Sequence, residues 1–120
     1  MNSKIFVLED DDAILEVTKL ILESEGFEVT GFSTVADFNQ EKTLPDLYLL
    51  DIMLPDGNGM AVCESLKQGA ETGDIPVILM SAHIDLAKRK ESSGADSFIA
   101  KPFDVYALID IITGLLKQPT

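Results

Sequence analysis

Residues 47–59 read LYLLDIMLPDGNG, and the place of Asp51 in this stretch decides how the rest of the chain is interpreted. Four apolar or aromatic residues lead directly into Asp51, and so short an apolar run is typical of a strand buried on both faces. The following PDGNG, residues 55–59, favours a loop. Asp51 is therefore predicted to lie at the C-terminal end of a central strand, the edge at which open α/β sheets bind ligands.

Strand-like and helix-like patterns alternate along the whole chain. Short apolar or alternating runs predict five strands, at residues 4–8, 27–31, 47–51, 75–80 and 96–100. Apolar residues at helical spacing predict a helix after each strand, at residues 13–24, 35–38, 59–67, 84–93 and 105–116. Short connections between alternating strands and helices indicate right-handed crossovers and a parallel sheet that helices cover on both faces, the α/β class.

Length, charge and cysteine content restrict the possible functions. A chain of 120 residues suits one domain, and we expect residues 1–120 to form it. The net charge of −12 argues against direct binding to nucleic acid or to an anionic membrane. No apolar run approaches the roughly 20 residues that span a bilayer, and the start lacks the pattern of a signal peptide. Because Cys63 is the single cysteine, no internal disulfide can form, and we expect a cytoplasmic protein with Cys63 in its core.

Polar residues whose side chains could bind a metal or take part in a reaction lie at the ends of four of the five predicted strands. They are Glu9 with Asp10, Asp51, Ser81 and Lys101. Each alone has an ordinary interpretation as a helix cap, a turn residue or a surface lysine, but parallel strands would bring all of them to one edge of the sheet. Carboxylates that lie close together raise one another's pKa, and a divalent cation would relieve that repulsion. An all-oxygen ligand set favours Mg²⁺ over zinc.

Phosphoryl transfer is the chemistry that this combination of residues favours. With a metal ion and a lysine beside it, Asp51 could accept a phosphoryl group as an acyl phosphate. Lys101 and Mg²⁺ would neutralise the charge on the phosphoryl oxygens, and the Ser81 hydroxyl could donate a hydrogen bond to one of them. Two alternatives use similar residues: an aspartyl phosphatase of the haloacid-dehalogenase kind, and a flavodoxin-like module that binds a phosphorylated cofactor.

Four segments carry a resemblance to a known family. They are VLEDD at 7–11, LLDIMLPDGNG at 49–59, LMSAH at 79–83 and IAKPF at 99–103. In order and spacing, the chain from Lys4 to about Lys117 resembles the receiver domain of two-component response regulators, of the chemotaxis-regulator-like kind. Phosphatases of the haloacid-dehalogenase kind require a second acid two residues after the nucleophile. This chain has Met53 there, which argues against that alternative. In the absence of a metal ion, the acids at 9–12 would repel the phosphate of a flavodoxin-like cofactor.

The resemblance implies a fold and a metal site. The expected fold is flavodoxin-like, a doubly wound (βα)5 arrangement whose five parallel strands follow the order 2-1-3-4-5. Asp51 is expected to be the phosphoacceptor. Mg²⁺ is expected to be held by Asp10, by Asp51, by Glu9 through water and by the backbone carbonyl of Met53.

The resemblance also implies how the site would act as a switch. Ser81 and Lys101 are expected to hold the phosphoryl group, and Phe98 is expected to turn inward as Ser81 moves. The Lys101–Pro102 peptide is expected to be cis.

The function implied is that of a protein which catalyses only its own phosphorylation and dephosphorylation. A sensor histidine kinase or a histidine phosphotransfer protein would supply the phosphoryl group in a phosphorelay. Phosphorylation would change a protein-interaction surface made by the helix at 84–93, the strand at 96–100 and the helix at 105–116. That surface would bind a downstream protein target.

Overall fold

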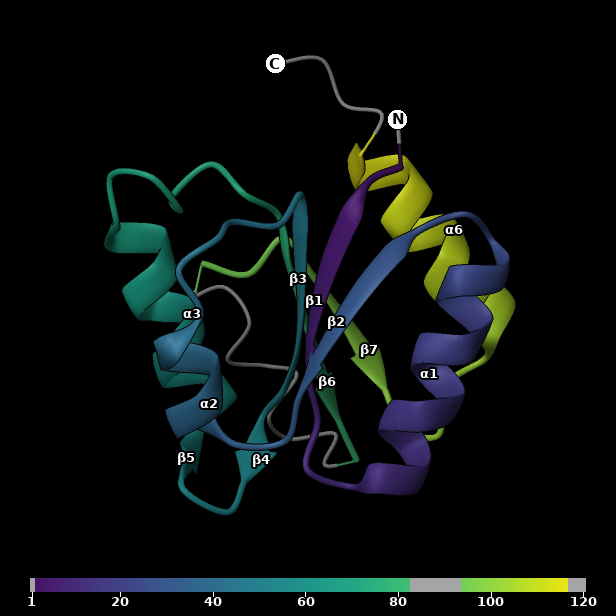
Figure 1. The fold of residues 1–120 in the computed structure, drawn as a ribbon, viewed down its shortest axis with the longest axis horizontal. Helices are drawn as coiled ribbons and strands as arrows, with labels where there is room; N and C mark the ends of the chain where they lie inside the picture. The colour runs from purple at the N-terminus through teal and green to yellow at the C-terminus, as the bar shows by residue number, and fades with distance from the viewer. Residues whose placement is uncertain (1, 83–93, 117–120) are drawn as a thin grey trace.

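The computed structural model describes residues 2–82 and 94–116, and there it shows a five-stranded parallel sheet between two layers of helices. The strand order is β2-β1-β3-β6-β7, which in sequence order of the sheet strands is the expected 2-1-3-4-5. Helices α1 and α6 cover one face of the sheet, and α2 and α3 cover the other (Figure 1). The predicted doubly wound, flavodoxin-like α/β fold is confirmed, while the helix predicted at 84–93 lies outside the described residues.

The strands of the sheet lie close to the predicted positions. They are β1 (Lys4–Leu8), β2 (Glu28–Phe32), β3 (Leu47–Asp51), β6 (Val77–Ser81) and β7 (Ser97–Ala100). β2 begins one residue later than predicted because the Phe27 N–H still bonds the Leu22 carbonyl at the end of α1. β6 begins later than predicted because the Ile75 N–H donates to the Thr72 carbonyl and so belongs to a turn. At its other end β6 extends to Ser81, whose carbonyl accepts the Lys101 N–H.

The helices begin at polar caps. Within the described residues they are α1 (Asp12–Ser24), α2 (Val35–Gln40), α3 (Gly59–Gln68) and α6 (Val105–Leu116). Carboxylate, hydroxyl or amide oxygens accept the first free N–H groups of each helix, as N-caps do. The residues that supply these oxygens are Asp11, Thr34, Asn58 and Asp104. Gly26 follows α1 with a φ of +93°, a conformation that favours glycine.

The stretch after Asp51 is more ordered than the predicted loop. Met53–Leu54 forms β4 and Gly57–Asn58 forms β5, and the two pair as a small antiparallel hairpin. The prediction of a loop over residues 55–59 is therefore wrong for residues 57–58, which form β5. Pro55 and Asp56 make the turn of the hairpin, which is where a proline can be tolerated.

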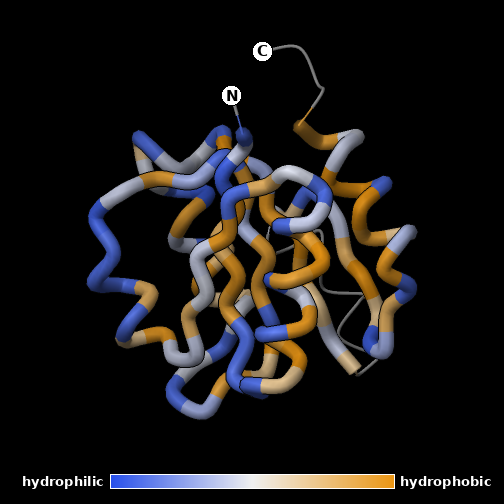
Figure 2. The backbone as a smooth tube through the Cα atoms, turned by 45° about the vertical axis from the view of Figure 1, so that its right-hand side comes forward, coloured by the Kyte–Doolittle hydropathy of each residue, from blue (hydrophilic) through white to orange (hydrophobic). Residues whose placement is uncertain are grey.

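The core lies on both faces of the sheet, as the alternation of strands and helices predicts. Ile5, Val7 and Leu49 face α1 and α6, whereas Leu8 and Leu50 face α2 and α3. Figure 2 shows hydrophobic residues along the central strands and hydrophilic residues at the periphery. Cys63 is fully buried, as predicted. None of the described helices has the length and apolar character needed to cross a membrane.

Candidate functional site

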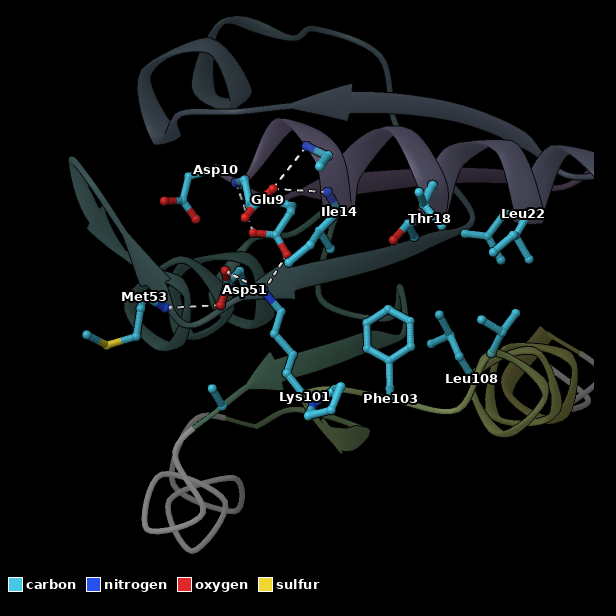
Figure 3. A pocket seen from close by; sticks show the side chains of 17 residues that line it. Glu9, Asp10, Ile14, Thr18, Leu22, Asp51, Met53, Lys101, Phe103 and Leu108 are labelled. Carbon is cyan, nitrogen blue, oxygen red and sulfur yellow. Dashed lines mark hydrogen bonds and ion pairs between the residues drawn. The ribbon is translucent and has the colours of Figure 1, made fainter.

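The C-terminal ends of three strands bring together the residues predicted for the site. Glu9 follows β1, Asp51 ends β3 and Lys101 follows β7. Figure 3 shows the side chains of these three residues pointing toward one another. Glu9 and Asp51 are only 1% and 5% exposed, so their carboxylates need charged or hydrogen-bonding partners.

Lys101 is the cationic partner of both buried carboxylates. Its Nζ donates to the Asp51 Oδ2 at 3.0 Å and also to the Glu9 Oε1. The Lys101 side chain is itself mostly buried. Burial acts to lower the pKa of Lys101, but its hydrogen bonds to Glu9 and Asp51 outweigh that effect, and the pKa is raised. Lys101 is therefore charged at neutral pH and compensates part of the negative charge of the cluster.

Glu9 shows the electrostatic cost of placing acids together. Burial and the neighbouring Asp51 carboxylate raise the pKa of Glu9 from 4.5 to about 7, although the hydrogen bonds from Lys101 and from the Asp11 N–H oppose the rise. The Asp11 N–H donates to the Glu9 Oε2 at 3.2 Å. An added cation beside Glu9 would favour its ionised form.

The acid cluster fits a hard divalent cation. Glu9, Asp10 and Asp51 each offer a carboxylate oxygen, and these oxygens lie within 4.8 Å of one another. Asp10 is exposed, so the cluster opens to solvent on one side. A ligand set made of oxygen atoms, with room for water, is what Mg²⁺ prefers. The residues present therefore fit the predicted ion.

The backbone after Asp51 is packed against the site. The Met53 N–H donates to the Asp51 Oδ1 at 3.3 Å, and the Gly59 N–H donates to the Ile52 carbonyl at 2.9 Å. A Cβ atom on Gly59 would lie 2.1 Å from the Asp51 carbonyl oxygen. Only glycine therefore allows α3 to begin so close to the end of β3.

Comparison with known proteins identifies the family. Residues 5–113 match the response regulator receiver domain. The chain belongs to this family. It is a receiver domain of two-component signalling, a phosphoacceptor module rather than a true enzyme.

Individual relatives agree with this assignment. The chain is 34% identical over 122 residues to the phosphate regulon transcriptional regulatory protein PhoB of Rhizobium meliloti. The alignment covers 98% of this chain and 54% of PhoB. The chain thus spans about half the length of the curated relatives it matches.

Solved structures match over nearly the whole chain. A CheY-like receiver domain protein of Methanospirillum hungatei has a TM-score of 0.83 at 30% identity, covering 97% of this chain and 94% of that one. The response regulator TrrA of Thermotoga maritima, solved in complex with Mg²⁺-BeF, has a TM-score of 0.86 at 26% identity, covering 96% of this chain and 99% of that one.

The remaining predicted residues of the receiver site lie at or near the same edge. Ser81 ends β6, is 1% exposed, and accepts the Lys101 N–H with its carbonyl at 2.8 Å. Phe98, on β7, is half-buried and packs against the core on the α2–α3 face. The Lys101–Pro102 peptide is cis, as expected. The Met53 side chain is exposed and, in Figure 3, points away from the carboxylates. The roles of Ser81, Phe98 and the Met53 carbonyl stay predictions.

Sequence reasoning missed two features beside the site. A cavity of about 800 Å³ runs from the acid cluster along α1 to α6, with mostly apolar walls that include Ile14, Phe103 and Leu108 (Figure 3). The sequence places Val17 on the apolar stripe of α1, but only the structure shows that Val17 lines this cavity and is 55% exposed. The second feature is Asp56, which hydrogen-bonds α2 and carries no signal in the local sequence.

Proposed function

We propose that Asp51 is the residue that accepts the phosphoryl group. The observation that carries this assignment is the buried Asp51 carboxylate, 3.0 Å from the Lys101 Nζ and within the cluster that it forms with Glu9 and Asp10. A carboxylate oxygen of Asp51 attacks phosphorus in the phosphohistidine of the donor. The P–O bond forms as the P–N bond breaks, and the imidazole nitrogen leaves with the electron pair of that bond.

The other residues of the site hold the incoming phosphoryl group. Lys101 donates a charge-assisted hydrogen bond to one of its oxygens, and the Ser81 hydroxyl donates to another. Buried donors placed where negative charge increases stabilise the transition state more than they would in water. The position of Ser81 at the end of β6, next to β3, supports this role.

Glu9, Asp10, Asp51 and the Met53 carbonyl are the proposed Mg²⁺ ligands. When bound, the ion would neutralise the charge on the phosphoryl oxygens. The oxygen-only donor set of the cluster supports Mg²⁺. The related TrrA structure, named as a complex with Mg²⁺-BeF, supports the same ion.

Phosphorylation would bias the receiver domain between two conformations. A new group with about −1.5 to −2 charges favours inward positions of Ser81 and Lys101, and Phe98 would turn inward as Ser81 moves. A nearly complete shift needs about 5.5 kcal/mol of differential stabilisation. The resulting surface would include β7 and α6, and residues 84–93, the third part of the predicted surface, lie outside the described residues.

Receiver domains act with histidine kinases, and we propose a sensor histidine kinase or a histidine phosphotransfer protein as the donor. A downstream protein would bind the altered surface. Relatives such as PhoB are named as transcriptional regulators, but this chain matches only about half of them, so direct DNA contact is not assigned to it. A single domain over residues 1–120 and a cytoplasmic location stay predictions.

Intact-mass spectrometry tests the assignment of Asp51. The protein is incubated with acetyl phosphate and Mg²⁺, beside Asp51→Asn and an EDTA sample. We expect a single phosphoryl adduct that requires both Asp51 and the metal. Asp46→Asn is the matched control, because Asp46 is exposed, accepts the Lys4 N–H at 2.7 Å and lies before β3, whereas Asp51 lies at its C-terminal end. An adduct that persists in Asp51→Asn would contradict the assignment.

A further inference from the structure

Asp56 joins the hairpin that follows the phosphoacceptor to a different part of the chain. Its Oδ1 accepts the Val35 N–H at 2.9 Å, and its Oδ2 accepts the Ala36 N–H at 3.1 Å. Both hydrogen bonds lower the pKa of Asp56, which is therefore ionised at neutral pH. The two acceptor oxygens and the two donors form a bidentate contact between segments about 20 residues apart in sequence.

Helix α2 depends on this contact for its first turn. The helix has six residues, of which only Phe38 is fully buried, so a single side chain provides most of its anchoring to the core. Thr34 caps the Asp37 N–H, and Asp56 accepts the two N–H groups before it. Unpaired N–H donors in the first turn destabilise a helix, and a carboxylate placed there also interacts favourably with the helix dipole.

A packing contact lies beside these hydrogen bonds. A Cβ atom on Gly57 would lie 2.9 Å from the Val35 Cγ2, so the hairpin backbone rests directly on the start of α2. Asp56 and Gly57 therefore fix the tip of the β4–β5 hairpin at two adjacent points.

The other end of the same hairpin carries the proposed metal ligand. Met53 begins β4, pairs with Asn58 of β5, and donates its N–H to the Asp51 Oδ1 at 3.3 Å. Movement of the hairpin tip would change where the Met53 carbonyl lies relative to the Asp51 carboxylate. Residues that hold metal ligands in place without touching the metal commonly influence its affinity.

We propose that Asp56 is a positioning residue, which clamps the β4–β5 hairpin to α2 and so holds the Met53 carbonyl where a divalent cation bound by Asp51 can reach it. This inference rests on the proposed Mg²⁺ site. It also implies that Mg²⁺ binding and the order of the first turn of α2 are coupled, because coupling between two sites is reciprocal.

Three single substitutions separate the clamp from other effects. Asp56→Asn keeps the size of the side chain but replaces one of the two acceptors by an NH₂ group. Asp37→Asn removes the same charge from the exposed side of α2, where the Asp37 carboxylate accepts none of the N–H groups that Asp56 accepts. Thr34→Ala weakens the cap of α2 and leaves the Asp56 contact in place.

The first measurement is the Mg²⁺ dissociation constant, from titration of the amide signals in nuclear magnetic resonance spectra with Mg²⁺ alone. We expect Asp56→Asn to weaken binding on the order of tenfold, at the low end for residues that orient metal ligands. Asp37→Asn should stay within about twofold of the wild type. Thr34→Ala loosens the first turn of α2 but keeps the Asp56 contact, so it should weaken binding less than Asp56→Asn does. Equal weakening in Asp56→Asn and Asp37→Asn would reveal a simple charge effect and overturn the proposal.

The second measurement is hydrogen exchange at the Val35 and Ala36 amides of the wild type, with and without Mg²⁺. Slower exchange with Mg²⁺, lost in Asp56→Asn, supports the clamp. Exchange that is the same with and without Mg²⁺, in a wild type that does bind the ion, overturns the clamp but leaves the metal site intact. Failure of the wild type to bind Mg²⁺ would overturn both the clamp and the proposed site.

Discussion

The ammonium nitrogen of Lys101 lies 3.0 Å from a carboxylate oxygen of Asp51, a residue 50 positions earlier in the chain, and the same nitrogen contacts Glu9. Lys101 thus lies between two acids of the proposed phosphoryl-transfer site. Its contact with both carboxylates stabilises an arrangement of like charges that would otherwise repel each other.

Replacing Lys101 should slow phosphorylation without removing the phosphoacceptor. In Lys101→Met, we expect the phosphoryl adduct to form from acetyl phosphate about 100-fold more slowly, because a buried donor to the phosphoryl oxygens is lost. The measurement is a time course by intact-mass spectrometry. Lys67→Met is the control, since Lys67 pairs with Asp96 rather than with an acid of the site. Equal rates in Lys101→Met and the wild type would refute the role of Lys101.

The stability of the metal-free protein should fall as the pH rises from 5 to 7.5. The folded protein holds the Glu9 proton with a pKa of about 7, above the ordinary 4.5. The stabilisation from protonated Glu9 is therefore fully present below pH 4.5 and lost as the pH passes through 7, a change of up to a few kcal/mol. The pKa values of Glu41 and Asp56 are lowered, so these two carboxyls change the stability only at lower pH.

Thermal unfolding in EDTA across that pH range checks this expectation. Glu9→Gln should flatten the pH dependence, because the group no longer titrates. Mg²⁺ added at pH 7.5 should raise the melting temperature of the wild type, since a ligand that binds only the folded state stabilises it. A melting temperature that rises with pH in EDTA would show that another group governs the dependence.

Gly59→Ala should destabilise the protein and disturb the site. The added Cβ would lie 2.1 Å from the Asp51 carbonyl oxygen, so the end of β3 or the start of α3 must move. We expect a loss of about 1–3 kcal/mol in the free energy of unfolding in urea, together with weaker Mg²⁺ binding. Gly114→Ala is the matched control, because nothing lies within 4 Å of its Cβ position in α6. It should stabilise the protein by up to about 1 kcal/mol.

Asp96→Ala should lower stability at the edge opposite the site. The Asp96 Oδ2 accepts the Val77 N–H at 2.8 Å and the Lys67 Nζ at 2.7 Å, which joins α3, β6 and the start of β7. Removing this acceptor should cost about 1–3 kcal/mol in urea unfolding. Mg²⁺ affinity should be unchanged, and a marked loss of affinity would mean that the two edges are coupled.

The sequence by itself determined the fold class and the main members of the site. Alternating apolar runs and helical spacing predict the parallel sheet. Because parallel strands end at one edge, the sequence alone groups five residues there: Glu9, Asp10, Asp51, Ser81 and Lys101. The motifs around these residues then indicated the receiver family and the cis peptide at Pro102. The fold and the family are confirmed because they depend on local patterns and on chain order, and the cis peptide that the family implies is also present, whereas the roles of the site residues stay predictions.

Only the tertiary structure decided which of these groups touch. Lys101 contacts both Glu9 and Asp51, Gly59 leaves no room for a side chain beside Asp51, and Asp56 caps a helix that begins 21 residues earlier. The ends of β2 and β6 likewise depend on hydrogen bonds to neighbouring segments. Propensity and spacing describe each segment separately, whereas contacts such as these depend on tenths of an ångström between segments far apart in the chain, and packing alone sets those distances.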